Sequence, residues 1–112
     1  MTIFEKIAAG QIPARIVHEA EDFMAFHDIS AQAPVHVLLV PRKCIARLAE
    51  AEAMHADLLG RMLLATREIA RQLGVLESGY RVVINNGRDA GESVPHLHIH
   101  LLAGRTLAWP PG

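Results

Sequence analysis

The stretch 95–102, PHLHIHLL, places a histidine at every second position, with branched aliphatic residues between the histidines. Successive side chains of a β-strand point to opposite faces of the sheet. A strand would therefore have one face of histidines and one of aliphatics: His96, His98 and His100 against Leu97, Ile99 and Leu101. A helix would scatter the same residues around its axis. The strand is the conformation that gives the histidines a shared site.

Three imidazoles on one face allow several kinds of chemistry, because the imidazole pKa lies near neutrality. They could simply face solvent, although this is unusual for three in alternation. They could bind zinc, since histidines at i and i+2 of a strand can share a metal, with His36, His27 or Cys44 as a further ligand. They could also act on phosphorus, where a neutral imidazole attacks and its neighbours hold oxygens or move protons.

The loop GRDAGES, residues 87–93, comes directly before the histidines. Gly91 and Ser93 offer a backbone N–H and a hydroxyl that suit phosphate oxygens. A Gly/Ser loop is by itself most often only a turn. Its position favours the phosphoryl interpretation but leaves zinc open.

The rest of the chain predicts an α+β domain. Thr2 and Glu5 match a capping box for a short helix that carries Ile3, Phe4 and Ile7 and ends at Gly10. Apolar residues at helical spacing predict one long amphipathic helix over 50–73. Strands are expected at 15–19, 23–28, within 33–43 with an end at Pro41, at 80–87 and at 94–102. This order predicts a five-stranded, mostly antiparallel sheet in a single domain of residues 1–112.

Length and composition narrow the class of protein. The chain has 112 residues, of which 51% are hydrophobic, and a net charge of −1. That size suits one compact domain, and that charge argues against a polybasic binder of nucleic acid or membrane surfaces. Cys44 is the only cysteine, so no intrachain disulfide can form, which fits a reducing compartment. Without a signal-type or membrane-spanning apolar run, we expect a cytoplasmic protein.

The histidine stretch matches the His-x-His-x-His-x-x pattern, with x hydrophobic, and on it the chain resembles the histidine triad (HIT) family. It resembles the Hint branch in particular, through blocks in the same order and approximate spacing: IFEKI, IPARIVHE, AFHDISAQAPVHVLLVPRK, LLG, GYRVVINNG, SVPHLHIHLLAGR and WPPG. The resemblance covers nearly the whole chain. It implies a nucleotide-binding hydrolase that cleaves purine nucleoside phosphoramidates to AMP or GMP, without a metal or other cofactor.

The resemblance also implies a homodimer. Two sheets would join across a two-fold axis with the long helices packed together, which would bury part of the region of Met54, Leu58 and Met62. The tail with Trp109 would reach the partner's active-site region.

The catalytic roles follow from the same resemblance. His98 matches the nucleophile, while His100 and Ser93 match positions that contact the phosphate. His96 and His36 match histidines that orient or polarise the nucleophile.

The nucleotide contacts are likewise implied by the resemblance. Asp28 matches the carboxylate that accepts the ribose hydroxyls, and Asn85 a polar contact near phosphate and sugar. The full set of expected contacts is Asp28, Ile29, Asn85, Gly91, Glu92, Ser93, His98, Ile99 and His100. The base would lie among apolar side chains, which offer area but no group to read the purine edge: Ile3, Phe4, Ile7, Phe26 and Leu38.

Two positions depart from the family's pattern. Glu92 stands where relatives commonly have Gln, and its carboxylate would repel a bound phosphate unless it faces solvent or carries a proton. Cys44 stands where many relatives have a His associated with occasional metal binding, which makes a structural metal less expected, although Cys can also ligate zinc. Two other functions remain open: a nucleotide-binding regulatory module with vestigial catalysis, and a zinc-dependent hydrolase.

Overall fold

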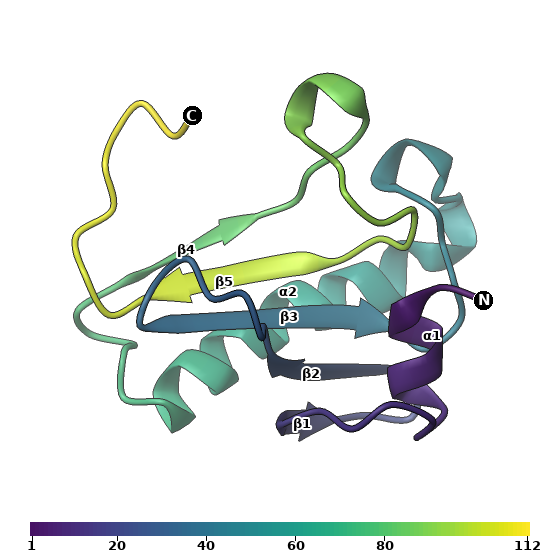
Figure 1. Cartoon of the computed structure of the whole chain (residues 1–112), viewed down its shortest axis with the longest axis horizontal. Coiled ribbons are helices and arrows are strands. Elements are labelled where there is room, and N and C mark those ends of the chain that lie inside the picture. The colour runs from purple at the N-terminus through teal and green to yellow at the C-terminus, as the bar shows by residue number, and fades with distance from the viewer.

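The computed structural model describes residues 1–112 and contains one five-stranded antiparallel sheet in the order β1-β2-β3-β5-β4. The helices and strands have these bounds: α1 Ile3–Ala8, β1 Ile16–Glu19, β2 Phe23–His27, β3 Val35–Pro41, α2 Ala56–Gln72, β4 Tyr80–Val83 and β5 Ile99–Ala103. The long α2 runs behind the sheet and the short α1 lies in front of it (Figure 1). The predicted α+β class is therefore confirmed.

The main hydrophobic core lies between the sheet and α2. Strands β2, β3 and β5 direct apolar side chains to it, and α2 contributes Met62 and Ile69, which are fully buried. Each such side chain stabilises the fold by about 1.5–3 kcal/mol. This face of the sheet is thus the main source of stability.

The alternation predicted for the histidine stretch is confirmed. Leu97, Ile99 and Leu101 belong to the core on the α2 side, and the histidines lie on the opposite face. The alternative in which the histidines merely face solvent is excluded, because His96 is fully buried and His98 is 6% exposed.

Strand β5 begins at Ile99 rather than at residue 94. The register pairs Leu39 with Ile99, so the next position on the same face, Leu97, would meet Pro41. Proline has no N–H to donate to a ladder. Instead, the Leu97 N–H donates to the carbonyl of Ile45 at 2.6 Å, which ties the segment before β5 to the segment after β3.

A second, smaller core lies under α1. Phe4 packs there with Met24, Phe26, Leu38 and Val40. The predicted capping box is present: Thr2 accepts the Glu5 N–H at 3.1 Å, and Glu5 accepts the Thr2 N–H at 2.9 Å. Because α1 is only a single turn and a half long, this cap and the burial of Phe4 are what hold it on the sheet.

Helix α2 begins at Ala56, not at residue 50. The preceding segment forms two 3₁₀ turns, Leu48–Glu50 and Ala53–His55, separated by extended backbone. A backbone group of this segment bonds to a distant part of the chain instead of to a helix: the Ala49 N–H donates to the side chain of Asn86 at 2.7 Å. Strand β4 likewise ends at Val83, before the predicted residue 87, where the chain leaves the sheet toward this contact. No helix has the length and apolar character needed to cross a membrane.

Of the region expected to be partly buried in a dimer, Met62 is already fully buried against the sheet within one chain, whereas Met54 is 76% exposed. Leu58 is also packed against that core. The apolar side chains that α2 leaves exposed are Leu63 and Leu64. The homodimer itself stays a prediction, and these leucines are the apolar groups that α2 could offer to it.

Candidate active site

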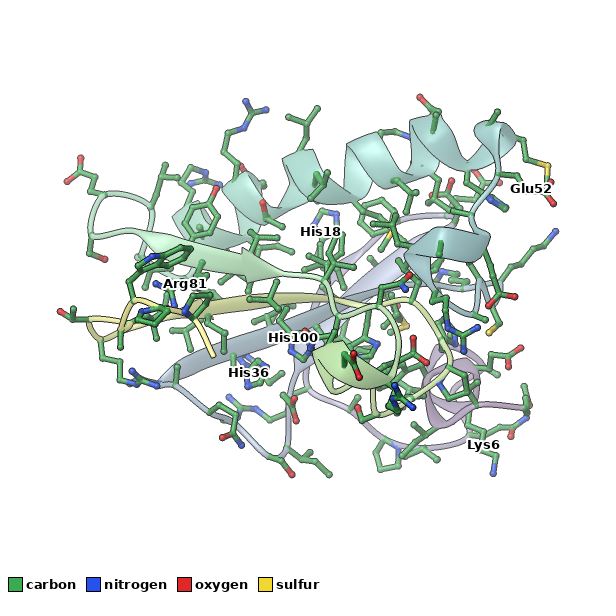
Figure 2. All side chains as sticks on the ribbon, turned by 90° about the horizontal axis from the view of Figure 1, so that it is seen from above. Lys6, His18, His36, Glu52, Arg81 and His100 are labelled. Carbon is green, nitrogen blue, oxygen red and sulfur yellow. The ribbon has the colours of Figure 1, made fainter.

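Four histidines meet on the face of the sheet opposite α2. His36 comes from β3 and His100 from the adjacent β5, and Figure 2 shows them side by side on the side of the sheet away from α2. The rings of His98 and His100 have centroids 4.9 Å apart, and those of His36 and His100 are 5.2 Å apart. His36 contacts His100 and not His98, so any influence of His36 on His98 passes through His100.

The ring of His98 has its tautomer set by the backbone. Its Nδ1 lies 2.7 Å from the carbonyl oxygen of His96, which can only accept, so Nδ1 carries the proton and donates. Nε2 of His98 therefore keeps its lone pair and makes no hydrogen bond within the chain. Phe4 packs its ring against His98 in an edge arrangement, with centroids 5.0 Å apart. His98 thus presents a fixed nucleophilic nitrogen.

A second chain of hydrogen bonds sets the tautomer of His100. The Gln32 N–H donates to Nδ1 of His36 at 3.0 Å, which leaves the proton of a neutral His36 on Nε2. That Nε2–H donates to Nδ1 of His100 at 2.9 Å and lies 3.4 Å from the Asp28 carboxylate. Nε2 of His100 therefore carries a proton, and this buried donor has no acceptor in the chain. A buried donor without an acceptor is costly, which makes it a candidate ligand contact.

The electrostatics of this face favour neutral imidazoles. Burial, followed by the charges of His98 and His36, lowers the pKa of His100 to about 4. Burial also lowers the pKa of His36 and of His96. These three rings are therefore uncharged at neutral pH, in agreement with the tautomers derived from the hydrogen bonds.

His96 anchors the site to α1. Its Nε2–H donates to the Pro41 carbonyl at 2.7 Å, and its Nδ1 accepts from the Thr2 hydroxyl at 2.7 Å. The capping box in the sequence identifies Thr2 as the start of a helix, but nothing in the sequence indicates its contact with His96, 94 residues away. Thr2 is thus a residue of the site that the sequence analysis missed.

Glu92 does not behave as either sequence-based alternative supposed. Its carboxylate neither faces solvent nor carries a proton, because Arg47 binds both of its oxygens, Nε to Oε1 at 2.9 Å and a terminal nitrogen to Oε2 at 3.1 Å. The Gly87 N–H also donates to Oε1 at 3.0 Å. The Arg47 guanidinium, and then this backbone bond, lower the pKa of Glu92. Arg47 is the second residue that the sequence analysis missed.

The other predicted nucleotide contacts are placed unevenly. Asp28 lies beside His36 and accepts the Ser30 N–H at 2.8 Å, and Asn85 is half-buried after β4. Gly91 and Ser93 are exposed in the loop before the histidines. The side chain of Ile99 points into the core on the α2 side, so it cannot contact a ligand among the histidines.

The predicted base slot is only partly assembled. Phe4, Phe26 and Leu38 pack together, with Ile7 against them. Ile3 lies outside this cluster and is 46% exposed. Ile29, next to Asp28 in the chain, is 98% exposed.

Two groups of side chains have metal-ligating atoms within 4.8 Å of one another: Asp28, His36 and His100, and Glu5, Cys44 and His96. His27 belongs to neither, since the alternation of β2 places it on the other face. In the first group a cation would have to displace the proton that His36 donates to His100. In the second, His96 uses both ring nitrogens in hydrogen bonds, and burial and Glu5 raise the pKa of the Cys44 thiol.

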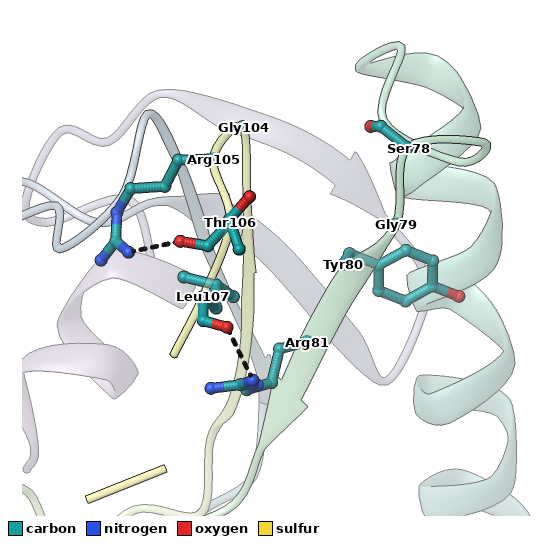
Figure 3. A pocket seen from close by; sticks show the side chains of 8 residues that line it. All are labelled: Ser78, Gly79, Tyr80, Arg81, Gly104, Arg105, Thr106 and Leu107. Atoms are coloured by element: carbon teal, nitrogen blue, oxygen red, sulfur yellow. Dashed lines mark hydrogen bonds between the residues drawn. The ribbon is translucent and has the colours of Figure 1, made fainter. Parts of the chain in front are cut away.

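A separate polar hollow of about 550 Å³ lies between the start of β4 and the end of β5, lined by Ser78, Gly79, Tyr80, Arg81, Gly104, Arg105, Thr106 and Leu107 (Figure 3). Arg81 donates to the carbonyls of Leu107 and Ala108, and Arg105 to that of Thr106. These arginines hold the C-terminal segment, and none of the predicted site residues lines this hollow.

Sequence comparison finds relatives along nearly the whole chain. A protein of Synechococcus elongatus described as an uncharacterized HIT-like protein is 56% identical over 111 residues, covering 99% of this chain and 96% of the relative. A protein of Zea mays described as a 14 kDa zinc-binding protein is 48% identical over 113 residues, covering 99% of this chain and 88% of the relative.

Solved structures agree with the fold. The HIT family hydrolase of Legionella pneumophila is 42% identical with a TM-score of 0.97, and each chain covers all of the other. The histidine triad nucleotide-binding protein of Candida albicans is 32% identical with a TM-score of 0.84, with 98% of this chain and 83% of that chain covered. The family model described as the HIT domain matches residues 9–107. On this match, and on the three alternating histidines at and just before the start of β5, the chain belongs to the HIT family.

Proposed function

We propose that the protein is a nucleotide-binding hydrolase that cleaves the P–N bond of purine nucleoside 5′-phosphoramidates to AMP or GMP and an amine. The observation that carries this is a pair of nitrogens on neighbouring rings: the lone pair on Nε2 of His98 and the acceptor-free Nε2–H of His100. A phosphoryl group uses both, because its phosphorus is electrophilic and its oxygens accept hydrogen bonds. The similarity to the Legionella hydrolase and to the Candida nucleotide-binding protein supports the same class.

The proposed reaction has two steps. Nε2 of His98 attacks the phosphorus, the P–N bond to the amine breaks, and the amine takes up a proton as it leaves. The adduct carries a positive charge on the His98 ring, which the hydrogen bond from Nδ1–H to the His96 carbonyl stabilises. Water then attacks the phosphorus and loses a proton to solvent, which balances the proton that the amine took from solvent; the bond to His98 breaks, and AMP or GMP is released with the ring neutral again.

Other groups would hold the nucleotide during this cycle. Nε2–H of His100 would donate to a non-bridging oxygen, and the Ser93 hydroxyl could add a second donor from the loop. Asp28 would accept the ribose hydroxyls, and the base would rest against Phe4 and its apolar neighbours. An apolar slot distinguishes purine from pyrimidine by buried area, but it distinguishes adenine from guanine poorly.

Substitution of His98 tests the proposal. His98→Asn and His98→Gly remove the nucleophile, so turnover of adenosine 5′-phosphoramidate should fall by about 10³ or more, while the AMP dissociation constant changes less than about threefold. His18→Asn, in β1 outside the site, is the matched control and should change neither. Equal losses of turnover and AMP affinity would contradict the nucleophile assignment. A wild-type protein that binds AMP but turns over no phosphoramidate would be a regulatory module instead.

A zinc-dependent hydrolase is the second candidate, favoured by the proximity of Asp28, His36 and His100 and by the description of the Zea mays relative. Neutral His, carboxylate and thiolate groups are the ordinary zinc ligands. Metal analysis of protein purified without added zinc, with turnover measured before and after EDTA, separates the two. We expect no stoichiometric zinc and unchanged turnover. Loss of turnover in EDTA with recovery on adding zinc would favour the metal enzyme.

A further inference from the structure

The Gly87–Ser93 loop brings a negative charge to the site proposed for the phosphate. It leads directly into the histidine stretch and carries Glu92, whose side chain is only 12% exposed. His98 is close enough to contribute to the lowered pKa of Glu92. A carboxylate in this position would repel the phosphate of a nucleotide unless another charge compensated it.

Arg47 supplies that compensation from a distant part of the chain. It lies 45 residues before Glu92, in the segment between β3 and α2, and it binds both oxygens of the carboxylate. A planar guanidinium that forms two parallel bonds fixes the position of the carboxylate as well as its charge. A further contact of Arg47 with Glu50 holds the guanidinium from its own segment.

Further hydrogen bonds hold the loop at both of its ends. At the start, the Asn86 side chain accepts the Ala49 N–H at 2.7 Å. At the finish, Glu92 accepts the Gly87 N–H at 3.0 Å, and its own N–H donates to the Gly87 carbonyl at 3.1 Å, which closes the loop on itself. Between them, Gly91 has a φ of +79°, a conformation that favours glycine. The loop is therefore a rigid turn tied to the segment that carries Arg47.

We propose that Arg47 is a positioning residue for the hydrolase. By binding Glu92 it cancels the charge of that carboxylate and fixes the Gly87–Ser93 loop, so that Ser93 and the backbone of Gly91 are held where phosphate oxygens can meet them. Arg47 does not touch the substrate; it acts through Glu92. The inference rests on the proposed function, because the phosphate is what the loop is positioned for.

The charges of the pair predict effects of opposite sign. Arg47→Gln leaves the carboxylate uncompensated, so we expect the AMP dissociation constant to rise at least about tenfold and kcat/KM to fall by at least as much. Glu92→Gln removes the negative charge but keeps an amide oxygen that can accept from Arg47 and from the Gly87 N–H, so AMP should bind as tightly as in wild type or more tightly. The double variant restores a neutral pair of hydrogen-bonding side chains, and we expect its AMP affinity to return to within about threefold of wild type.

The measurements are AMP titration by calorimetry and steady-state turnover of adenosine 5′-phosphoramidate, each at low and high salt. The Arg47→Gln deficit should shrink at high salt, because it arises from charge repulsion. Arg61→Gln is the matched control, since it breaks an ion pair with Asp22 and Asp57 away from the site and should leave AMP affinity unchanged. A wild-type protein without phosphoramidase activity would refute the proposed function. Two results with a fully active wild type would overturn the inference about Arg47. One is an Arg47→Gln variant with unchanged AMP affinity and turnover, and the other is a double variant that binds AMP as weakly as Arg47→Gln.

Discussion

Replacing Thr2 by Val tests how the short α1 supports the histidine face. The substitution keeps the shape of the side chain and removes the hydroxyl, which accepts the Glu5 N–H and donates to Nδ1 of His96. Loss of a helix N-cap costs about 0.5–2 kcal/mol. Leaving the buried His96 nitrogen without a partner costs about 1–3 kcal/mol. The two effects share one hydroxyl, so we expect a combined loss of about 2–3 kcal/mol in the free energy of unfolding.

Urea denaturation at neutral pH measures this loss directly, and thermal unfolding provides a second reading. For a domain of about this length each kcal/mol corresponds to roughly 4 °C, so Tm should fall by about 8–12 °C. Thr2→Ser keeps the hydroxyl and is the matched control, with an expected loss below about 0.5 kcal/mol. A Thr2→Val variant as stable as wild type, or a Thr2→Ser variant as unstable as Thr2→Val, would refute the reasoning.

Three further predictions concern pH, sugar and assembly. The pKa of His100 is about 4 in the folded chain, so between pH 6.5 and 4 this residue takes up a proton in the unfolded chain but not in the folded one. Acidification over this range should therefore lower the free energy of unfolding, by at most about 3 kcal/mol. Urea titrations should show a shallower dependence in His100→Gln, and an identical slope would contradict this. Deoxy-AMP should bind more weakly than AMP by roughly 1–3 kcal/mol in calorimetry, because Asp28 loses a donor, and equal affinities would exclude Asp28 from the ribose. Light scattering at micromolar concentration should find a dimer that Leu64→Glu weakens, whereas a wild-type monomer would reject the assembly.

The features that the sequence predicts well are those set by local geometry. The two-residue period of a strand places alternate side chains on opposite faces whatever the rest of the fold does, so the histidine face follows from PHLHIHLL alone. The N-terminal cap is equally local, because Thr2 and Glu5 are one helical turn apart. Their part in the site is not local, since it depends on which distant groups the fold brings to them.

The contacts that the sequence could not predict join segments far apart in the chain. The pairing of Arg47 with Glu92 explains how a carboxylate can sit beside the proposed phosphate site, but nothing in the two residues identifies them as partners. The sequence also could not decide which residues of the Met54, Leu58 and Met62 region stay exposed for a second subunit. An amphipathic helix has one apolar face, and here that face is used by the sheet, so it cannot also serve a second subunit.

The division of the sheet into two faces has a consequence for how this chain can tolerate change. Along residues 97–101, odd-numbered side chains enter the core, where truncation of an Ile or Leu costs about 2–5 kcal/mol, and even-numbered ones enter the site. In a saturation-mutagenesis screen that scores abundance and turnover separately, substitutions at the odd-numbered residues should therefore lower abundance. Substitutions at the even-numbered residues should lower turnover. His96 should break the alternation and score in both, because it is fully buried and also holds the carbonyl that orients His98. Substitutions at His98 and His100 should thus remove turnover without a matching loss of stability.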